Sequence, residues 1–169
     1  AYTTGDAARR EFDGSVTFLG RLDPVVSVSG QLVAAGEVRD VLREHPFVAD
    51  AVVVDQPDPR SGQAVLACVV LTGDAPSAET VAGQLRRHVY DTLGGLAFPR
   101  TVVIVDALPD GVPRRTLRRA LRMVAAAHHS ATIMLPAGQL EAAIAVAGQR
   151  QPHDMISDAP GKEPRRHEP

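Results

Sequence analysis

The stretch that decides the fold is VADAVVVDQPDPRSGQAVLACVVLT, residues Val48–Thr72. It holds two valine-rich runs, VADAVVVD and AVLACVVLT, joined by the turn-rich QPDPRSGQ. Runs of β-branched residues bounded by proline and glycine are typical of strands. Because the connection is short, antiparallel pairing is favoured. The stretch therefore predicts two paired strands in the core of the domain.

The flanking sequence adds helices and a third strand. Apolar residues recur at helical spacing over about residues 35–45, and again after Ser77 and after Pro113. Ser77 is expected to cap its helix. TVVIVD, residues 101–106, has the character of a third core strand. We therefore expect an α+β fold, a small three-stranded and mostly antiparallel sheet packed with helices. The residues expected to face inward from the helices are Val38, Val41, Leu42, His45, Val81, Leu85, Val89, Leu93, Leu117, Ala120, Leu121 and Val124.

Both ends of the chain differ from this middle. Residues 10–19 predict a β-hairpin that turns at Asp13-Gly14, and residues 25–30 (VVSVSG) alternate like a short strand. AGQLEAAIAVAGQ, residues 137–149, indicates one more short helix. Residues 151–169 are polar and rich in proline, which predicts a disordered tail.

Composition narrows the class of protein. The 169 residues suit one domain, and a net charge of −2 gives no electrostatic case for nucleic acid. The sequence has no apolar run of membrane-spanning length and no secretory signal. The single cysteine, Cys68, excludes an internal disulfide and favours a cytoplasmic location. Lys162 is the only lysine, so a mechanism that needs a lysine amine would have to use it.

Six segments between Tyr2 and Arg122 match one family in order and spacing. They are YTTGD, FLGRLDPVVSVSG, GEVRDVLREHPFVADAVVV, SGQAVLACVVL, TLGGLAFPR and VDALP. Together they resemble the C-terminal region of AMP-forming acetyl-CoA synthetases, which belong to the adenylate-forming superfamily. The resemblance implies a ligase that makes acyl-CoA from a carboxylate, ATP and CoA, releasing AMP and pyrophosphate. It also implies a small mobile C-terminal domain and a partner, the large adenylation domain.

The resemblance also divides the chain. Residues 1–22 would be the terminal hairpin of the large domain, and residues 23–127 the mobile C-terminal domain. Residues 128–150 would be a short C-terminal extension, followed by the disordered tail from 151 to 169. Because the sequence starts at Ala1, directly before YTTGD, we expect a fragment or processed product.

Site residues follow from the same resemblance. Asp6 matches a carboxylate that holds the ribose hydroxyls of ATP or AMP, and Arg21 matches an arginine that contacts the nucleotide. Asp23 matches the hinge about which the domain swings. The next residue is Pro24, whose ring fixes its own φ and restricts Asp23, so hinge rotation is expected to be limited.

Coenzyme A and a magnesium ion have expected positions too. Ser29 and Gly30 match backbone that lines the tunnel for the pantetheine arm of CoA. The residues that match a magnesium site formed largely by backbone oxygens are Arg43, His45 and Val48. Oxygen ligands suit such a hard cation, but a histidine before a proline is also a common helix-end residue.

Three positions depart from the family pattern. Leu32 stands where a phosphate-binding arginine is expected, and Tyr90 stands where an arginine on the CoA side is expected. In LPDGVPRRTLRRALR, Arg115 occupies the place of the lysine that serves adenylation, and the flexible Ser-Gly before it is replaced by Pro113-Arg114. Arginine is bulkier and planar, so the exchange is not conservative at a close-contact site, and we expect Arg115 not to function catalytically.

Three functional hypotheses remain open. The first is a truncated relative of acetyl-CoA synthetase that is inactive alone. The second is a non-catalytic binding or regulatory module, and the third is one chain of a split ligase. The second would use a basic ridge opposite the apolar stripe of the last predicted core helix, formed by Arg114, Arg115, Arg118, Arg119 and Arg122. Because no aromatic residues alternate with these arginines, nucleic acid is not the expected partner.

Overall fold

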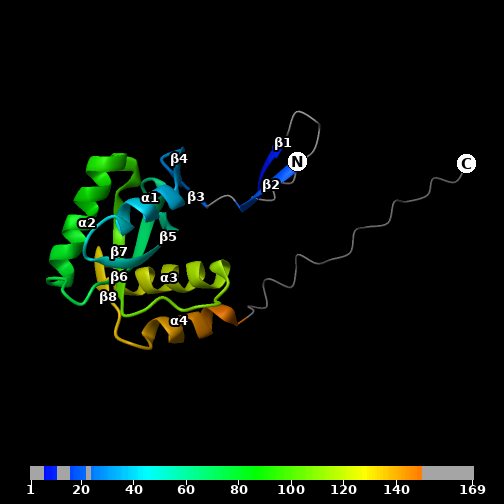
Figure 1. Ribbon diagram of the computed structural model, residues 1–169. Coiled ribbons are helices and arrows are strands. Elements are labelled where there is room, and N and C mark those ends of the chain that lie inside the picture. The colour runs from blue at the N-terminus through cyan, green and yellow to red at the C-terminus, as the bar shows by residue number, and fades with distance from the viewer. Residues whose placement is uncertain (1–5, 11–15, 22–23, 150–169) are drawn as a thin grey trace, which may run out of the picture.

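The computed structural model describes residues 6–10, 16–21 and 24–149 (Figure 1). Two short strands, β1 (Asp6–Arg10) and β2 (Val16–Arg21), pair antiparallel. The hairpin expected near the N-terminus is therefore confirmed in its strands. Its turn at Asp13-Gly14 and the tail expected over residues 151–169 lie outside the described residues.

The main sheet is mixed and has six strands. They are β3 (Val25–Val28), β4 (Gln31–Ala34), β5 (Val48–Asp58), β6 (Gly62–Leu71), β7 (Pro99–Val105) and β8 (Thr132–Met134). The strand β6 pairs antiparallel with β5 and with the end of β3, and parallel with β7, which in turn pairs parallel with β8. The helices are α1 (Ala35–Arg43), α2 (Ala78–Leu93), α3 (Arg114–His128) and α4 (Gln139–Gly148), with a 3-10 turn η1 (Gly95–Ala97).

The α+β class is confirmed, but the expectation of three strands is wrong. The predicted core strands are β5, β6 and β7, and the short VVSVSG run is β3. The residue pattern does not reveal β4 and β8, which have four and three residues. Strands this short carry too little alternation to stand out. The strand β8 forms beside the longer β7, and β4 forms by hairpin pairing with β3, which is equally short.

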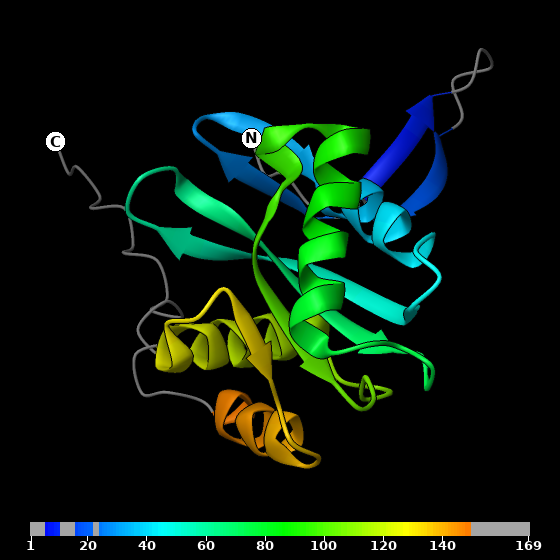
Figure 2. The same cartoon turned by 90° about the vertical axis from the view of Figure 1, so that its left-hand side faces the viewer.

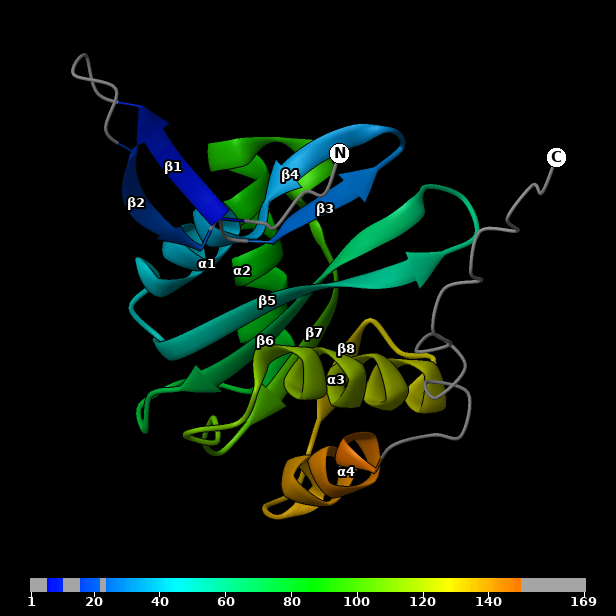
Figure 3. The same cartoon turned by 90° about the vertical axis from the view of Figure 1, so that its right-hand side faces the viewer.

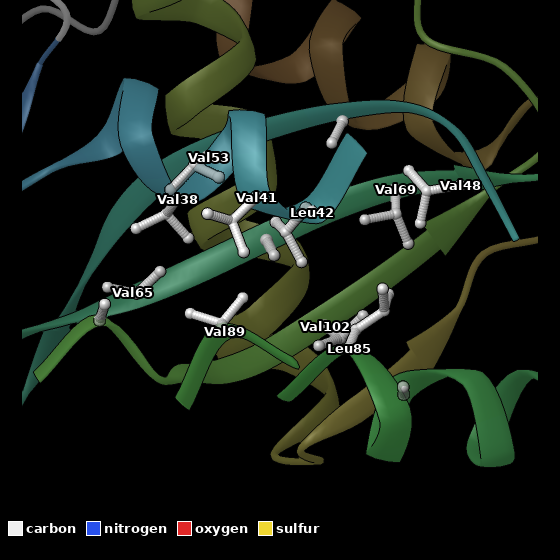
Figure 4. Close-up of a cluster of buried hydrophobic side chains, with 14 of the residues drawn as sticks. Val38, Val41, Leu42, Val48, Val53, Val65, Val69, Leu85, Val89 and Val102 are labelled. Carbon is white, nitrogen blue, oxygen red and sulfur yellow. The ribbon is translucent and has the colours of Figure 1, made fainter. Parts of the chain in front are cut away.

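Helices cover both faces of the sheet. The helices α1 and α2 share one core with one face of β5, β6 and β7, and Figure 4 shows part of it around Leu42 and Leu85. The other core joins α3 and α4 to the opposite face, with Leu66 and Cys68 at its centre. Figures 2 and 3 show the helices on the two sides of the strands. Strand residues point alternately to the two faces of the sheet. Because helices cover both faces, every residue of β6 from Ala64 to Val69 is buried.

The helix predictions hold with two exceptions. The hydroxyl of Ser77 accepts a hydrogen bond from the Thr80 amide, and α2 ends at Leu93, before Gly94. The inward residues of α3 and the first three of α2 are buried. One exception is His45, which lies beyond the end of α1 and is only partly buried. The other is Leu93, which is 36% exposed. It is the last residue of α2, so the helix has already reached the edge of the core there.

Candidate functional site

The segment DGVPRR lies between the end of β7 and the start of α3. Gly111 has a φ of +70°, a left-handed conformation that suits glycine, and α3 begins at Arg114. The Pro113 carbonyl accepts hydrogen bonds from the amides of Thr116 (2.9 Å) and Leu117 (3.1 Å). Arg115 is therefore an exposed residue in the first turn of a helix.

The expected basic ridge on α3 is divided. Arg118 Nε lies 2.7 Å from Asp55 Oδ1, and the Arg122 guanidinium also pairs with Asp55. The Arg122 Nε atom additionally donates to the Asp55 carbonyl at 2.8 Å. Because the Asp55 side chain is only 6% exposed, two of the five arginines are drawn to β5. Both arginines remain partly exposed, so this part of the expected ridge pairs with the sheet and still reaches the surface.

A second buried carboxylate, Asp58, holds the β5–β6 turn. It accepts hydrogen bonds from the Ser61 hydroxyl and from the Ser61 amide (3.2 Å), and it pairs with Arg100 from β7. The hydrogen bond from Ser61 and the charge of Arg100 hold the pKa of Asp58 below its ordinary value, although burial opposes them. Residue patterns alone did not indicate a role for Asp55 or Asp58. The one sequence signal that could have indicated a role is an acidic residue at the end of an apolar strand.

Ser29 and Gly30 form the turn between β3 and β4. Their φ angles are 51° and 79°, as a two-residue hairpin turn of type I′ requires. The Ser29 amide donates to the Ser61 carbonyl at 2.9 Å, which joins this turn to the β5–β6 turn. Apart from its chain neighbours, no atom of the described residues lies within 4 Å of a Cβ built on Gly30, so the backbone conformation and not crowding calls for glycine there.

Leu32 and Tyr90, the two positions where arginine is expected, lie at the same end of the domain. Leu32 on β4 is 71% exposed and Tyr90 near the end of α2 is 56% exposed. The turn η1 contacts both β4 and α2, which brings the two elements together. Three more exposed apolar side chains follow in sequence, Leu93, Leu96 and Phe98. This end of the domain is therefore apolar at the positions where the resemblance led us to expect positive charge.

The three residues expected at a magnesium site surround the end of α1. Arg43 is the last helical residue, and the His45 carbonyl accepts from the Val48 amide at 3.0 Å. The His45 and His88 ring centroids are 5.9 Å apart, and burial together with His88 lowers the pKa of His45. Among the described residues, no group of three or more His, Cys, Asp and Glu side chains could hold a metal ion. A site here would depend on backbone oxygens, and the His45 carbonyl retains a second lone pair for it.

The expected nucleotide residues lie on the N-terminal hairpin. Asp6 on β1 and Arg21 on β2 are direct partners in the register of the two strands. Strand pairing thus brings together two positions that are far apart in the sequence. The expected hinge residue, Asp23, lies outside the described residues. The next residue, Pro24, accepts a hydrogen bond from the Ala35 amide at 3.0 Å, which ties it to the start of α1.

Comparison with known proteins shows which kind of domain this chain resembles. Residues 37–111 match the family described as "AMP-binding enzyme C-terminal domain". The matched part runs from α1 to the loop before α3 and is similar to that domain.

The relatives are acetyl-coenzyme A synthetases. The chain is 41% identical over 124 residues to the enzyme of Streptomyces coelicolor and 43% identical over 125 residues to that of Deinococcus radiodurans. These matches cover 73% and 74% of this chain, but only 19% of each relative. The crystal structure of a Brucella canis acyl-CoA synthetase matches with a TM-score of 0.55 and 35% identity, over 75% of this chain and 23% of that one. Within the described part of the chain, no helix has the length and apolarity that a membrane span requires.

Proposed function

We propose that this chain acts as the mobile C-terminal domain of an acetyl-CoA synthetase-like ligase. It would work with a large adenylation domain and would not form acyl-adenylate by itself. The observation that carries the proposal is the segment DGVPRR, in which Arg115 takes the place of the family's lysine inside the first turn of α3. The match to acetyl-coenzyme A synthetases supports the family, and the segment supports the loss of adenylation.

The chemistry of Arg115 explains the expected loss. A lysine ammonium is a compact charge on a flexible stem, whereas a guanidinium is planar and donates in a fixed fork. The backbone around Arg115 is helical and follows Pro113, so the segment lacks the freedom of a glycine-flanked loop. The charge is retained, but the group is expected not to reach between the reacting carboxylate and the α-phosphate.

The remaining site residues are assigned by the same resemblance. Asp6 and Arg21, paired across the hairpin, would contact the nucleotide. The backbone of Ser29 and Gly30 would line the path of the pantetheine arm. Leu32 and Tyr90 stand where arginines are expected and carry no positive charge. The phosphate groups of ATP and CoA would therefore contact fewer positively charged side chains. A magnesium ion at Arg43, His45 and Val48 would be held by carbonyl oxygens and would supply fixed positive charge.

Two alternatives differ in the structural support they receive. A binding module that uses the α3 ridge loses support, because Arg118 and Arg122 are engaged by Asp55. A split ligase, in which a separate chain supplies the large domain, shares every structural feature with the proposal. It differs in one expected result, because the reconstituted pair would then adenylate acetate.

An AMP-release assay with acetate, ATP and CoA tests the proposal. The chain is assayed alone and with the large domain of the Streptomyces coelicolor relative, and CoA transfer is assayed separately with preformed acetyl-adenylate. We expect no AMP from the chain alone or from the pair. Adenylation by the pair is expected to rise at least about tenfold when Arg115→Lys is combined with Leu32→Arg, as restored phosphate contacts lower the barrier.

Arg119→Lys is the matched control, since it makes the same exchange one turn further along α3. It should leave adenylation unchanged. AMP release by the unmodified chain alone would disprove the proposal, and release by the unmodified pair would favour the split ligase. If the double variant stayed inactive while CoA transfer from acetyl-adenylate proceeded, the defect would lie elsewhere, with Pro24 as the next position to change.

A further inference from the structure

The tip of the β3–β4 hairpin lies beside the β5–β6 turn (Figure 3). The ladder between β3 and β6 is a single residue pair, Val28 with Gly62. Next to this pair, the Ser29 amide donates to the Ser61 carbonyl at 2.9 Å. Farther along, β6 pairs with β7 instead, from Val65 onward. The backbone contact that orients the tip of the hairpin is therefore confined to a few residues.

The side chain of Gln63 extends this contact. Its Oε1 atom accepts a hydrogen bond from the Ser27 amide at 2.7 Å. Val28 and Gln31 close the two-residue turn of the hairpin, so the amide of Ser27 points away from β4. Ser27 and Gln63 are both partly buried. The Gln63 side chain thus supplies an acceptor beyond the end of the backbone ladder.

Ser61 is in turn held by a buried carboxylate. Asp58 accepts hydrogen bonds from the Ser61 hydroxyl and the Ser61 amide, and the Arg100 guanidinium pairs with it. The Asp58 side chain is only 8% exposed, so its charge depends on these partners. Because Asp58 fixes Ser61, the carbonyl that receives the Ser29 amide keeps a defined position.

Apolar packing also holds the hairpin, but it does not fix the direction of the turn. Val26 is buried in the core under α1 and α2, whereas Ser29 and Gly30 are exposed. The hydrophobic effect is non-directional, while a hydrogen bond depends on distance and angle. The bonds made by Gln63 and Ser61 therefore determine where the turn points.

From these contacts we propose that Gln63 and Ser61 are positioning residues for CoA. They hold the β3–β4 hairpin in the orientation in which the backbone of Ser29 and Gly30 lines the path of the pantetheine arm. This inference rests on the proposed function, which gives the turn its role. It assigns a task to two residues that the family resemblance leaves without one. Each acts through the turn and not on the reacting atoms.

The first test uses the full chain alone and follows amide hydrogen exchange by NMR. Gln63→Leu removes the acceptor of the Ser27 amide, and we expect this amide to exchange at least about fivefold faster, as for the loss of one hydrogen bond. Gln63→Glu keeps an oxygen acceptor and should retain slow exchange. Gln56→Leu is the matched control, because it removes a side-chain bond from β5 to Thr101 of β7 and no contact of the hairpin. Circular dichroism confirms that each variant is folded.

The second test measures acetyl-CoA formation from preformed acetyl-adenylate and CoA by the chain with the large domain of the Streptomyces coelicolor relative. Gln63→Leu should raise KM for CoA at least about threefold, because a smaller share of the hairpins has the competent orientation. Both kcat and KM for acetyl-adenylate should stay unchanged, which is the mark of lost binding and not of lost chemistry.

Three further comparisons sharpen the second test. Ser61→Ala should raise KM for CoA in the same way, and it leaves the Asp58–Arg100 pair intact, so no buried charge loses its partner. Gln63→Glu should behave like the unmodified chain, and Gln56→Leu should have no effect. Pantetheine, which has the arm of CoA but lacks the nucleotide, should show the same rise in KM with Gln63→Leu.

The outcomes separate this inference from the proposed function. Unchanged exchange of the Ser27 amide in Gln63→Leu would overturn the inference whatever the pair does. So would faster exchange with an unchanged KM for CoA in an active pair, or a rise in KM that is absent with pantetheine. If the unmodified pair forms no acetyl-CoA, the proposed function fails, and the positioning role falls with it.

Discussion

At the residue scale, Asp55 ties two arginines of α3 to β5. Its carboxylate is buried, and a buried charge without partners would be costly. Arg118 and Arg122 supply two partners, and both remain partly exposed. One acidic residue in a valine-rich strand therefore engages two of the arginines that helical spacing alone places on the outer face of the helix.

Asp55→Asn should destabilise the fold. The substitution keeps the shape but leaves two guanidinium groups without their counter-charge, and we expect a loss of about 2 kcal/mol in the free energy of unfolding. This is less than for a fully buried pair, because Arg118 and Arg122 remain partly exposed. Urea unfolding followed by circular dichroism measures it. Asp91→Asn breaks the exposed pair with Arg87 and serves as the control. Equal effects of the two substitutions would contradict the assigned role of Asp55.

At the element scale, the β3–β4 turn and the first turn of α3 show local conformation set by few residues. Ser29 and Gly30 both have the positive φ angle, in the left-handed region, that a tight hairpin turn needs. Of the two residues, only the glycine adopts this conformation without strain. Pro113 stands before the first residue of α3, where a residue without an amide proton is tolerated. Both turns lie at positions that the family resemblance links to CoA and to adenylation.

Gly30→Ala should weaken the β3–β4 hairpin. A Cβ at a φ of +79° is strained even with open space around it, so we expect a loss of about 1 kcal/mol. Gly73→Ala is the control, because Gly73 also has open space but no positive φ. It should be neutral or slightly stabilising. Thermal unfolding compares the two, and the interpretation of the turn fails if Gly30→Ala costs no more than Gly73→Ala.

At the scale of the whole molecule, the sheet separates two cores. Leu85 belongs to the core under α1 and α2, and Leu66 to the core under α3 and α4. Both side chains are fully buried. The two helix layers therefore stabilise the sheet from opposite faces, and the two leucines belong to separate clusters of buried side chains.

Leu66→Ala and Leu85→Ala should each cost about 3 kcal/mol, the usual effect of a cavity at a buried leucine. Because the residues lie in separate cores, the double variant should lose the sum of the single effects to within about 0.5 kcal/mol. Guanidinium chloride unfolding of the four proteins measures this. A coupling larger than about 1 kcal/mol would show that the two cores are not independent.

Part of the fold was accessible from residue patterns. The burial of Leu117, Ala120, Leu121 and Val124 followed from helical spacing, and the pairing of β5 with β6 followed from a short connection between valine-rich runs. The strand β8 was not accessible, because its three residues form a strand only beside β7. For the site, sequence order predicts Arg115, Leu32 and Tyr90 as departures from the family pattern, but it predicts no role for Asp55.

The sequence by itself determined the class of domain and the main helices and strands, since these depend on local spacing. It also predicts that Arg115 takes the place of the family's lysine, since that depends on residue identity alone. The tertiary structure decided how charges are used. It drew Arg118 and Arg122 to Asp55, and it brought Arg39 and Arg43 of α1 and Arg114 of α3 to one cleft over β5. The physical reason is that a charge acts over the distances set by packing, and those distances join residues far apart in the chain.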